Sequence, residues 1–134
     1  DEGKIVETWD ALVDLQKDGL AHSIGVSNFG IQHLEAIRKA GRPLPVVNQI
    51  EMHPLIYQRR KDLVEYCKKY GITIMAFGSL FEGFTEFFDQ PTLLEISERA
   101  QKNVPQILLR WAIDHGFVII PTSSSSKQRQ RDNY

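Results

Sequence analysis

The residues that could do chemistry in this chain stand at the ends of short apolar runs. The words GVSNF (residues 25–29), VVNQIEMHP (46–54) and VIIPTSS (118–124) each pass from β-branched residues into hydroxyl or amide side chains. Such runs are typical of strands buried on both faces, whose carboxyl ends can present polar groups. Because these ends meet at one edge of a parallel sheet, the pattern predicts a ligand site along one rim of an α/β barrel.

The first candidate group combines a hydroxyl with two primary amides. Ser27 and Asn28 are adjacent at one predicted strand end, and Gln49 stands at the next. Together they offer donors and acceptors, which a ligand carboxamide needs in equal measure. The alternative is that Ser27 and Asn28 cap the following helix, because both residue types are good N-caps. The presence of Gln49 favours the ligand interpretation.

The second candidate group follows the third predicted strand in the words MAFGSL. Phe77 offers a flat ring that could stack on an aromatic ligand, although core packing is the better explanation of any single phenylalanine. The segment after it is rich in Gly and Phe, has no clear period and is predicted to be a loop over residues 78–91. Its phenylalanines could flank an apolar or aromatic substrate: Phe81, Phe84, Phe87 and Phe88.

The third candidate group lies in the segment IIPTSSSSKQRQRDN near the end of the chain. Thr122, Ser123 and Arg129 stand around the predicted start of a helix near Lys127. Hydroxyls, an arginine and the free N–H groups of a helix start form an anion site. A flexible Ser-rich loop before a solvated basic helix is an equally good explanation of this composition.

Helices and strands are predicted to alternate along the chain, which indicates a parallel sheet covered by helices. The apolar spacing predicts strands over 23–26, 46–50, 72–77 and 117–120. Helices are predicted over 5–18, 31–41, 58–70 and 92–101, from Pro105 to Gly116, and from Lys127 onward to Tyr134. Thr92 with Glu95 reads as a capping box, and Ile107, Leu108, Trp111 and Ala112 read as a buried stripe. Four strands are half of a closed barrel of this type, which needs about 250 residues.

The composition excludes several classes of protein. With 134 residues and 42% hydrophobic content the chain is predicted to be one domain, and its net charge of −1 gives no attraction to nucleic acid or anionic membranes. No apolar run approaches the roughly 20 residues of a membrane span. The single cysteine, Cys67, fits a reducing compartment such as the cytoplasm. Because the chain begins with Asp1 rather than Met, we expect a fragment.

Several catalytic and metal-binding signatures are missing from the sequence. No GxGxxG, GxxxxGK[ST] or GxSxG motif is present, so dinucleotide-fold, P-loop and hydrolase assignments lack support. Four histidines show no metal spacing, namely His22, His33, His53 and His115. Of these, His53 is predicted to be structural.

The order and wording of GVSNF, VVNQIEMHP, MAFGSL and IIPTSS resemble the aldo-keto reductases over essentially the whole chain. The resemblance implies an α/β fold of the (β/α)8 TIM-barrel type. Residues 1–134 would form only its C-terminal half, strands 5–8 with flanking helices, truncated at both ends. It also implies that Ser27, Asn28 and Gln49 bind the carboxamide of a nicotinamide cofactor. Phe77 stands in place of a family tyrosine that stacks on the nicotinamide, and Leu80 matches a family leucine.

The resemblance also bears on which cofactor is used. Family members that prefer NADPH have a lysine where this chain has Thr122, and Gly78-Ser79 replaces a Ser-Pro pair. With one extra serine in the alignment, Arg129 falls on the family arginine near the 2′-phosphate and the adenine. Asp132 and Asn133 then fall on a Glu-Asn pair. The implied cofactor is NADPH, with NADH as the alternative because threonine lacks the charge of lysine.

The implied reaction is the reduction of aldehydes or ketones to alcohols by an NAD(P)H-dependent oxidoreductase. In the family a tyrosine donates the proton, assisted by Asp, Lys and His, and all four come from the first four strands. None of the tyrosines here fits that role: Tyr57, Tyr66, Tyr70 or Tyr134. This chain alone is therefore predicted to be inactive, with a missing N-terminal half or a partner chain covering the open barrel. Two alternatives remain, a non-catalytic half-barrel acting as a scaffold subunit and a different (β/α) protein that binds a phosphate ligand.

Overall fold

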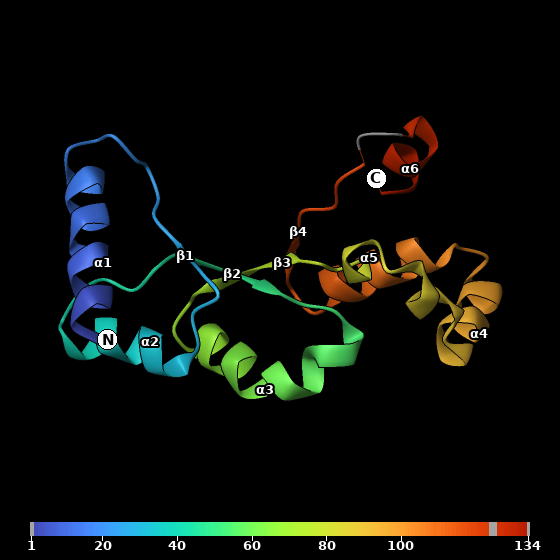
Figure 1. Ribbon diagram of the computed structural model, residues 1–134, viewed down its shortest axis with the longest axis horizontal. Coiled ribbons are helices and arrows are strands. Elements are labelled where there is room, and N and C mark those ends of the chain that lie inside the picture. The colour runs from blue at the N-terminus through green and yellow to red at the C-terminus, as the bar shows by residue number, and fades with distance from the viewer. Residues whose placement is uncertain (1, 124–125, 134) are drawn as a thin grey trace. The chain divides into compact units, whose positions relative to one another are not determined.

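The computed structural model describes residues 2–123 and 126–133 (Figure 1). It divides into two compact units. The first comprises Asp1–Ile50 and Arg60–Ile74, and the second comprises Glu51–Arg59 and Met75–Tyr134. Predictions that involve Asp1, Ser124 and Tyr134 concern positions outside the described residues.

The core of the first unit forms around its first helix. Helix α1 (Glu2–Lys17) buries Trp9 and Val13, which pack with Ile24 and Ile37. The Trp9 Nε1–H also donates to the Pro43 carbonyl at 2.8 Å, so the one polar atom of this buried ring is satisfied.

Two short parallel strands follow in the first unit. Strand β1 (Val26–Ser27) pairs with β2 (Val47–Glu51), with Ser27 opposite Gln49. The prediction of a strand over residues 23–26 was wrong in its extent, because the ladder begins only at Val26. A Cβ on the preceding Gly25 would lie 2.9 Å from the Val47 carbonyl oxygen, so only glycine allows this close approach.

Two helices are hydrogen-bonded to each other in the first unit, to which the second of them belongs only from residue 60 onward. Helix α2 (Ile31–Lys39) buries Leu34, Ala36 and Ile37. Helix α3 (Pro54–Lys69) begins at Pro54 rather than at the predicted residue 58, and proline suits the first turn of a helix. The Tyr66 hydroxyl on α3 donates to Glu35 on α2 at 2.6 Å, and Arg38 pairs with the same carboxylate at 2.7 Å.

The remaining strands confirm the prediction of a parallel sheet. Strand β3 (Thr73–Phe77) runs parallel to β4 (Val118–Ile119), with Met75 opposite Val118. Within the first unit the Thr73 backbone N–H donates to the Val46 carbonyl. Within the second unit the Met52 backbone N–H donates to the Phe77 carbonyl. Hydrogen-bonded neighbours therefore follow the order β1-β2-β3-β4.

The helices of the second unit correct two predictions. Helix α4 (Pro91–Ala100) begins at Pro91 with Gln90 as N-cap and no side-chain cap bond, so the capping box of Thr92 with Glu95 was wrong. Helix α5 (Val104–Asp114) is instead capped by a box formed by Asn103 and Gln106. Its buried residues are Val104, Leu108, Leu109 and Ala112, whereas the predicted Ile107 and Trp111 are only half-buried.

The segment predicted as a loop over 78–91 contains two short 3₁₀ turns, η1 (Phe81–Gly83) and η2 (Thr85–Asp89). Phe81 is 3% exposed and packs with Val104 and Leu108. Both Phe81 and Glu82 have φ of 54°, a left-handed conformation that costs energy in residues with a side chain.

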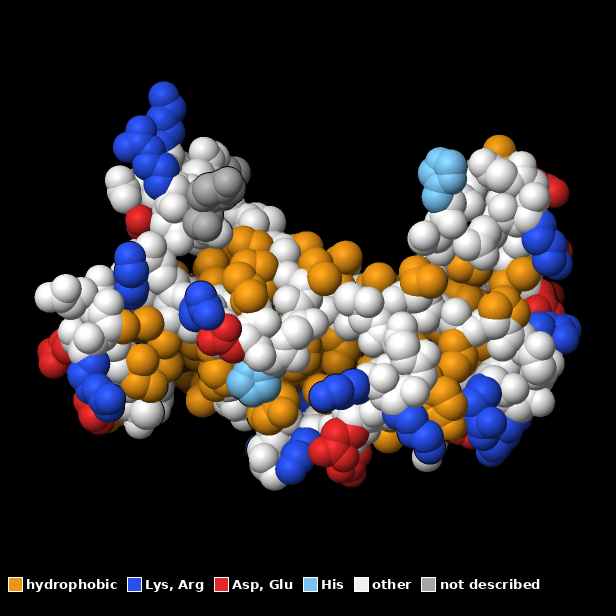
Figure 2. Space-filling view, turned by 180° about the vertical axis from the view of Figure 1, so that it is seen from behind, with side chains coloured by type: hydrophobic (Ala, Val, Ile, Leu, Met, Phe, Trp, Pro, Cys, Tyr) orange, Lys and Arg blue, Asp and Glu red, His pale blue; other side chains and the backbone are white. Residues whose placement is uncertain are grey.

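The last helix, α6 (Lys127–Asp132), begins at the predicted residue and has Ser126 as its N-cap. Charged side chains of both signs are interspersed over the visible surface, and apolar side chains also reach it (Figure 2). Among the described residues, no helix is long and apolar enough to cross a membrane.

Candidate functional site

The polar strand ends of the first unit lie together as the sequence predicted. The Ser27 hydroxyl donates to the Gln49 carbonyl at 3.1 Å, and the Asn28 amide nitrogen lies 3.4 Å from the Ser27 oxygen. The Asn28 backbone N–H donates to the Gln49 carbonyl at 2.8 Å. Ser27 and Asn28 thus lie at the carboxyl end of β1, where both are hydrogen-bonded to the backbone carbonyl of Gln49 on the adjacent parallel strand.

Helix capping does not explain these residues. Helix α2 begins at Ile31 with Gly30 as its N-cap, and the Gly30 N–H donates to His33 Nδ1 at 3.2 Å. Asn28 has φ of 57° and is exposed, as is Ser27, whereas Gln49 is half-buried. Asparagine tolerates the left-handed conformation better than most residues, and here that conformation turns the chain away from the strand. Both side chains are therefore within reach of a ligand, which would replace the hydrogen bonds that they make here with Gln49 and with each other.

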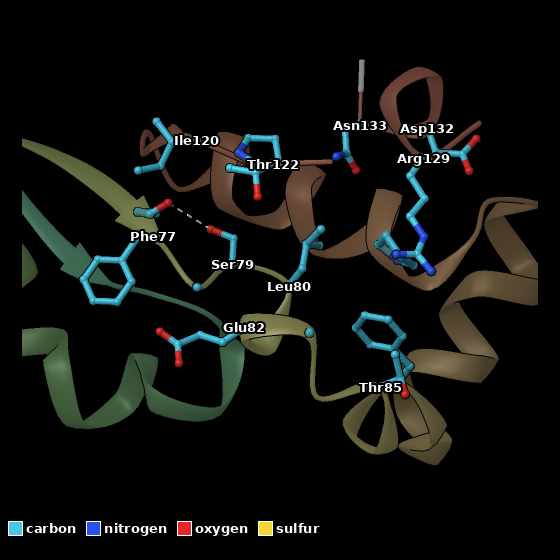
Figure 3. A pocket seen from close by; sticks show the side chains of 16 residues that line it. Phe77, Ser79, Leu80, Glu82, Thr85, Ile120, Thr122, Arg129, Asp132 and Asn133 are labelled. Atoms are coloured by element: carbon cyan, nitrogen blue, oxygen red, sulfur yellow. Dashed lines mark hydrogen bonds between the residues drawn. The ribbon is translucent and has the colours of Figure 1, made fainter. Parts of the chain in front are cut away.

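The second unit contains a pocket of its own. A cavity of about 540 Å³ lies between the end of β3, the turns that follow it, residues 120–122 and helix α6 (Figure 3). That volume is within the range of small-molecule sites. Its lining residues are Ala76, Phe77, Gly78, Ser79, Leu80, Glu82, Gly83, Thr85, Phe88, Pro105, Ile120, Pro121, Thr122, Arg129, Asp132 and Asn133.

Most of the predicted residues of the second unit line this pocket. The set comprises Phe77, Leu80, Thr122, Arg129, Asp132 and Asn133. Phe77 is half-buried, so its ring is not sealed in the interior. Ser123 is not among the lining residues: its hydroxyl lies 3.4 Å from the Ser126 carbonyl, and its own carbonyl accepts from Gln130 at 2.8 Å. Its polar groups are therefore engaged with Ser126 and Gln130 at the start of α6.

One hydroxyl at the pocket is already engaged. Ser79 is buried, and its Oγ donates to the Ala76 carbonyl at 3.3 Å (Figure 3). Gly78 has φ of 64°, and a Cβ there would lie 3.1 Å from Glu51 Cγ and 3.3 Å from Glu82 Cγ. The Gly-Ser pair therefore forms a tight turn in which the serine hydroxyl is bonded to the backbone.

The charges in the pocket are mixed. Arg129 reaches from α6 into the pocket (Figure 3), while Glu82 and Asp132 contribute two carboxylates. Asp132 accepts a hydrogen bond from Gln128 at 2.9 Å. The Arg129 N–H donates to the Ser126 hydroxyl at 3.3 Å, so this backbone donor of the short helix is occupied by its own cap. Attraction for an anion therefore rests on the Arg129 guanidinium.

Sequence reasoning missed several lining residues. Phe88 was assigned to a substrate-flanking segment, and Pro105 was recognised only as a helix start. Glu82 and Thr85 carried no motif. The only signal that could have found them is their place in the segment directly after a predicted ligand-binding strand end. The idea that all four phenylalanines flank a substrate was wrong for Phe81, which is buried.

The remaining candidate groups have structural surroundings. His53 is 6% exposed, its Nε2 lies 3.1 Å from a Glu51 carboxylate oxygen, and its ring packs edge-on against Phe81. Cys67 is fully buried, and burial raises the pKa of its thiol, which opposes the reactive thiolate. Within residues 2–123 and 126–133, no group of His, Cys, Asp and Glu could hold a metal ion.

The alternating helices and parallel strands are those of an α/β protein, with polar groups at the carboxyl ends of its strands. The sequence pattern of the Aldo/keto reductase family matches residues 2–133. The chain belongs to that family.

Individual relatives agree with this assignment. The chain is 42% identical over 132 residues to the protein named "Uncharacterized oxidoreductase YtbE" of Bacillus subtilis (strain 168), which covers 98% of this chain and 45% of that protein. It is 44% identical over 120 residues to the glyoxal reductase of the same bacterium, a match that covers 90% of this chain and 42% of that protein. A solved structure of a Gox0644 mutant in complex with NADPH has a TM-score of 0.85 and 39% identity, covering 96% of this chain and 45% of that one. The chain thus spans less than half the length of these proteins.

Proposed function

We propose that this chain forms the cofactor-binding part of an NAD(P)H-dependent oxidoreductase that reduces aldehydes or ketones to alcohols. The observation that carries the proposal is the register of β1 and β2, which places Ser27 beside Gln49 and Asn28 next to both. A glyoxal reductase among the relatives and the NADPH in a related solved structure support it.

The proposed residues would hold different parts of the cofactor. Ser27, Asn28 and Gln49 supply the donors and acceptors that a nicotinamide carboxamide requires. In the second unit Phe77 offers a ring face on which a nicotinamide can stack, and Arg129 offers charge for a phosphate. A bound nicotinamide cofactor supplies the hydride; the residues named here bind and orient it.

The adenosine end would be held in the pocket of the second unit. Asp132 and Asn133 line it with an acceptor and an amide, and Leu80 contributes apolar surface. We propose NADPH as the cofactor, with NADH as the alternative because Thr122 can form hydrogen bonds but brings no positive charge. Ser123 is also a proposed cofactor contact, because it directly follows Thr122 in the chain.

The proposed architecture is the C-terminal half of a (β/α)8 barrel, corresponding to strands 5–8. Support comes from the four parallel strands in sequential order and from the coverage of less than half of each relative. In this proposal the tyrosine that donates the proton, and its Asp, Lys and His helpers, belong to the other half. Without general acid catalysis the rate falls by roughly 10²–10⁴-fold, so this chain alone is expected to be inactive. The lone cysteine, Cys67, supports a reducing location such as the cytoplasm.

Calorimetric titration of the chain with NADPH and with NADH tests the proposed function. Saturable binding of at least one of them is expected, without turnover of an aldehyde. Adding the N-terminal half of a related reductase is expected to produce aldehyde-dependent oxidation of the cofactor. Absence of binding to both dinucleotides would contradict the proposed function.

A groove in the first unit favours a second polypeptide as partner. The groove, of about 420 Å³, lies between α1 and β1, and its apolar lining includes Ile5, Trp9, Leu12, Val26 and Phe29. Apolar surface of this kind marks a site where another protein segment packs. The proposed occupant is the other half of the reductase barrel. The alternative is a non-catalytic scaffold role, which would be favoured if the chain bound a different protein stoichiometrically and bound no dinucleotide.

A further inference from the structure

The ring of Phe88 forms part of the wall of the pocket in the second unit. We propose that Phe88 is a further cofactor-binding residue, the platform on which the adenine ring stacks. This inference rests on the proposed function, because adenine is one end of the dinucleotide. It concerns the second unit only, to which every residue of the pocket belongs.

Phe88 is held firmly on one side. It is the fourth residue of η2 and packs against the buried cluster of Phe81, Val104 and Leu108. The Phe81 and Phe88 ring centroids lie 6.0 Å apart with an interplanar angle of 46°. Phe88 is half-buried, so part of its ring remains open on the pocket side. A ring fixed by packing loses little conformational entropy when a ligand stacks on it.

The rest of the pocket suits a planar base with a polar edge. Leu80 and Pro105 add apolar surface beside Phe88, while Asn133 and Asp132 bring a donor and two kinds of acceptor. Adenine has two apolar faces and an edge that both donates, through its amino group, and accepts, through its ring nitrogens. An apolar carbonyl substrate would make no hydrogen bond to these polar side chains, whereas the edge of adenine can.

Arg129 supplies a second planar surface. Its side chain extends into the same pocket (Figure 3), and no ion pair of Arg129 is found among the described residues. Guanidinium groups stack on aromatic rings and also attract phosphate. A base bound on Phe88 would therefore lie within reach of a cation that can contact either the ring or the attached ribose phosphate.

The neighbouring phenylalanines provide matched controls. Phe84 is 55% exposed and Phe87 is 38% exposed, and neither lines the pocket. Phe87 lies 5.6 Å from Phe81 and 6.4 Å from Phe84 between ring centroids. They share the loop and the aromatic chemistry of Phe88 but not its position.

The experiment measures binding of three probes to the purified chain: adenosine, ribose 5-phosphate and nicotinamide mononucleotide. In Phe88→Ala the adenosine affinity is expected to fall at least about fivefold, the effect of losing one base–aromatic stack. Phe88→Leu keeps the apolar packing but not the flat ring, and it is expected to lose affinity as well. Phe88→Tyr is expected to retain it, and Phe84→Ala to change it less than about twofold.

Two results would overturn the inference. One is adenosine affinity in Phe88→Leu equal to that of the unmodified chain while its circular dichroism is unchanged. The other is an equal loss of ribose 5-phosphate binding, which would show that the ring does not act on the base. If NADPH or NADH binds but adenosine ignores Phe88, only this inference fails. If adenosine binding depends on Phe88 while neither dinucleotide nor nicotinamide mononucleotide binds, the proposed function fails and the purine platform stands.

Discussion

The polar strand ends of the first unit and the pocket of the second unit are built in different ways. The register of β1 and β2 places Ser27 opposite Gln49, and the Asn28 backbone N–H donates to the Gln49 backbone carbonyl. The pocket draws on the end of β3 and also on the two turns after it, on Pro105 in the first turn of α5 and on a six-residue helix. A ladder fixes the neighbour of each residue, whereas a loop does not.

This difference shows at which positions a sequence motif predicts the location of a side chain. Where strands set the geometry, the predicted residues are found together. Where turns set it, most predicted residues line the pocket, but the Ser79 hydroxyl is bonded to the Ala76 carbonyl and Ser123 is not among the lining residues. Functional side chains on loops therefore need the structure before their roles can be assigned, and mutations should affect the two regions in different ways.

The largest effect is expected from Gln49→Ala in the first unit. A buried carboxamide that loses its partner costs about 1–3 kcal/mol, so the affinity for NADPH should fall by that amount in calorimetric titration. Asn28→Gly should act in the same direction without straining the left-handed backbone. Gln32→Ala, which removes an exposed amide from α2, is the control and should leave the affinity unchanged. Equal affinity in all four proteins would break the assignment of the strand-end group.

A smaller effect is expected in the pocket from Thr122→Lys. A partly exposed charge pair contributes about 0.2–1 kcal/mol, so the variant should bind NADPH more tightly and NADH as before. Arg129→Ala should weaken NADPH more than NADH, whereas Arg131→Ala, which lies outside the pocket, should do neither. The ratio of the two dissociation constants measures this. An unchanged ratio in both variants would mean that the 2′-phosphate does not lie in this pocket.

A pH-dependent effect on stability is expected in the first unit. Hydrogen bonds from Arg38, and then from Tyr66, lower the pKa of Glu35 from 4.5 to about 2. The folded state therefore favours the ionised carboxylate, and this stabilisation is present above about pH 4.5 and is lost as the pH falls toward 2. Glu35→Gln should lower the free energy of unfolding at pH 7 but progressively less between pH 4.5 and pH 3. Urea unfolding measures it, with Glu7→Gln as the exposed control; a difference independent of pH would refute this account.

The smallest effect is expected from Ser79→Ala. Because its hydroxyl donates to the Ala76 carbonyl, its loss should change NADPH affinity by less than about 0.5 kcal/mol. A tenfold weaker dissociation constant in titration would show that the hydroxyl turns toward the cofactor when it binds.

Much of the fold could be predicted from the spacing of apolar residues and from the glycines that follow the helices. Gly19, Gly41, Gly71 and Gly116 all have positive φ just beyond a helix, as their positions suggested. The start of α4 could not be predicted from Thr92, because Pro91 occupies the first helical position and moves the N-cap to Gln90. The extent of β1 could not be predicted either, since its apolar pattern continues back to Ile24 while the ladder does not.

The candidate site divides along the same line. Ser27 and Gln49 could be predicted because polar residues directly after buried strands gather at one edge. Phe88 could not, since nothing in a run of phenylalanines tells which ring is buried, which is exposed and which borders a cavity. In this segment those three environments belong to Phe81, Phe84 and Phe88.

The two tryptophans of the chain fall one in each unit. The indole of Trp9 is 2% exposed and hydrogen-bonded to Pro43, while that of Trp111 is half-buried, with its ring centroid 4.3 Å from that of His115. Each unit therefore carries a built-in fluorophore in a distinct environment. Two variants that each retain one tryptophan would report, through its fluorescence, the unfolding of one unit. Comparing them would show whether the two units unfold in one cooperative step or in succession.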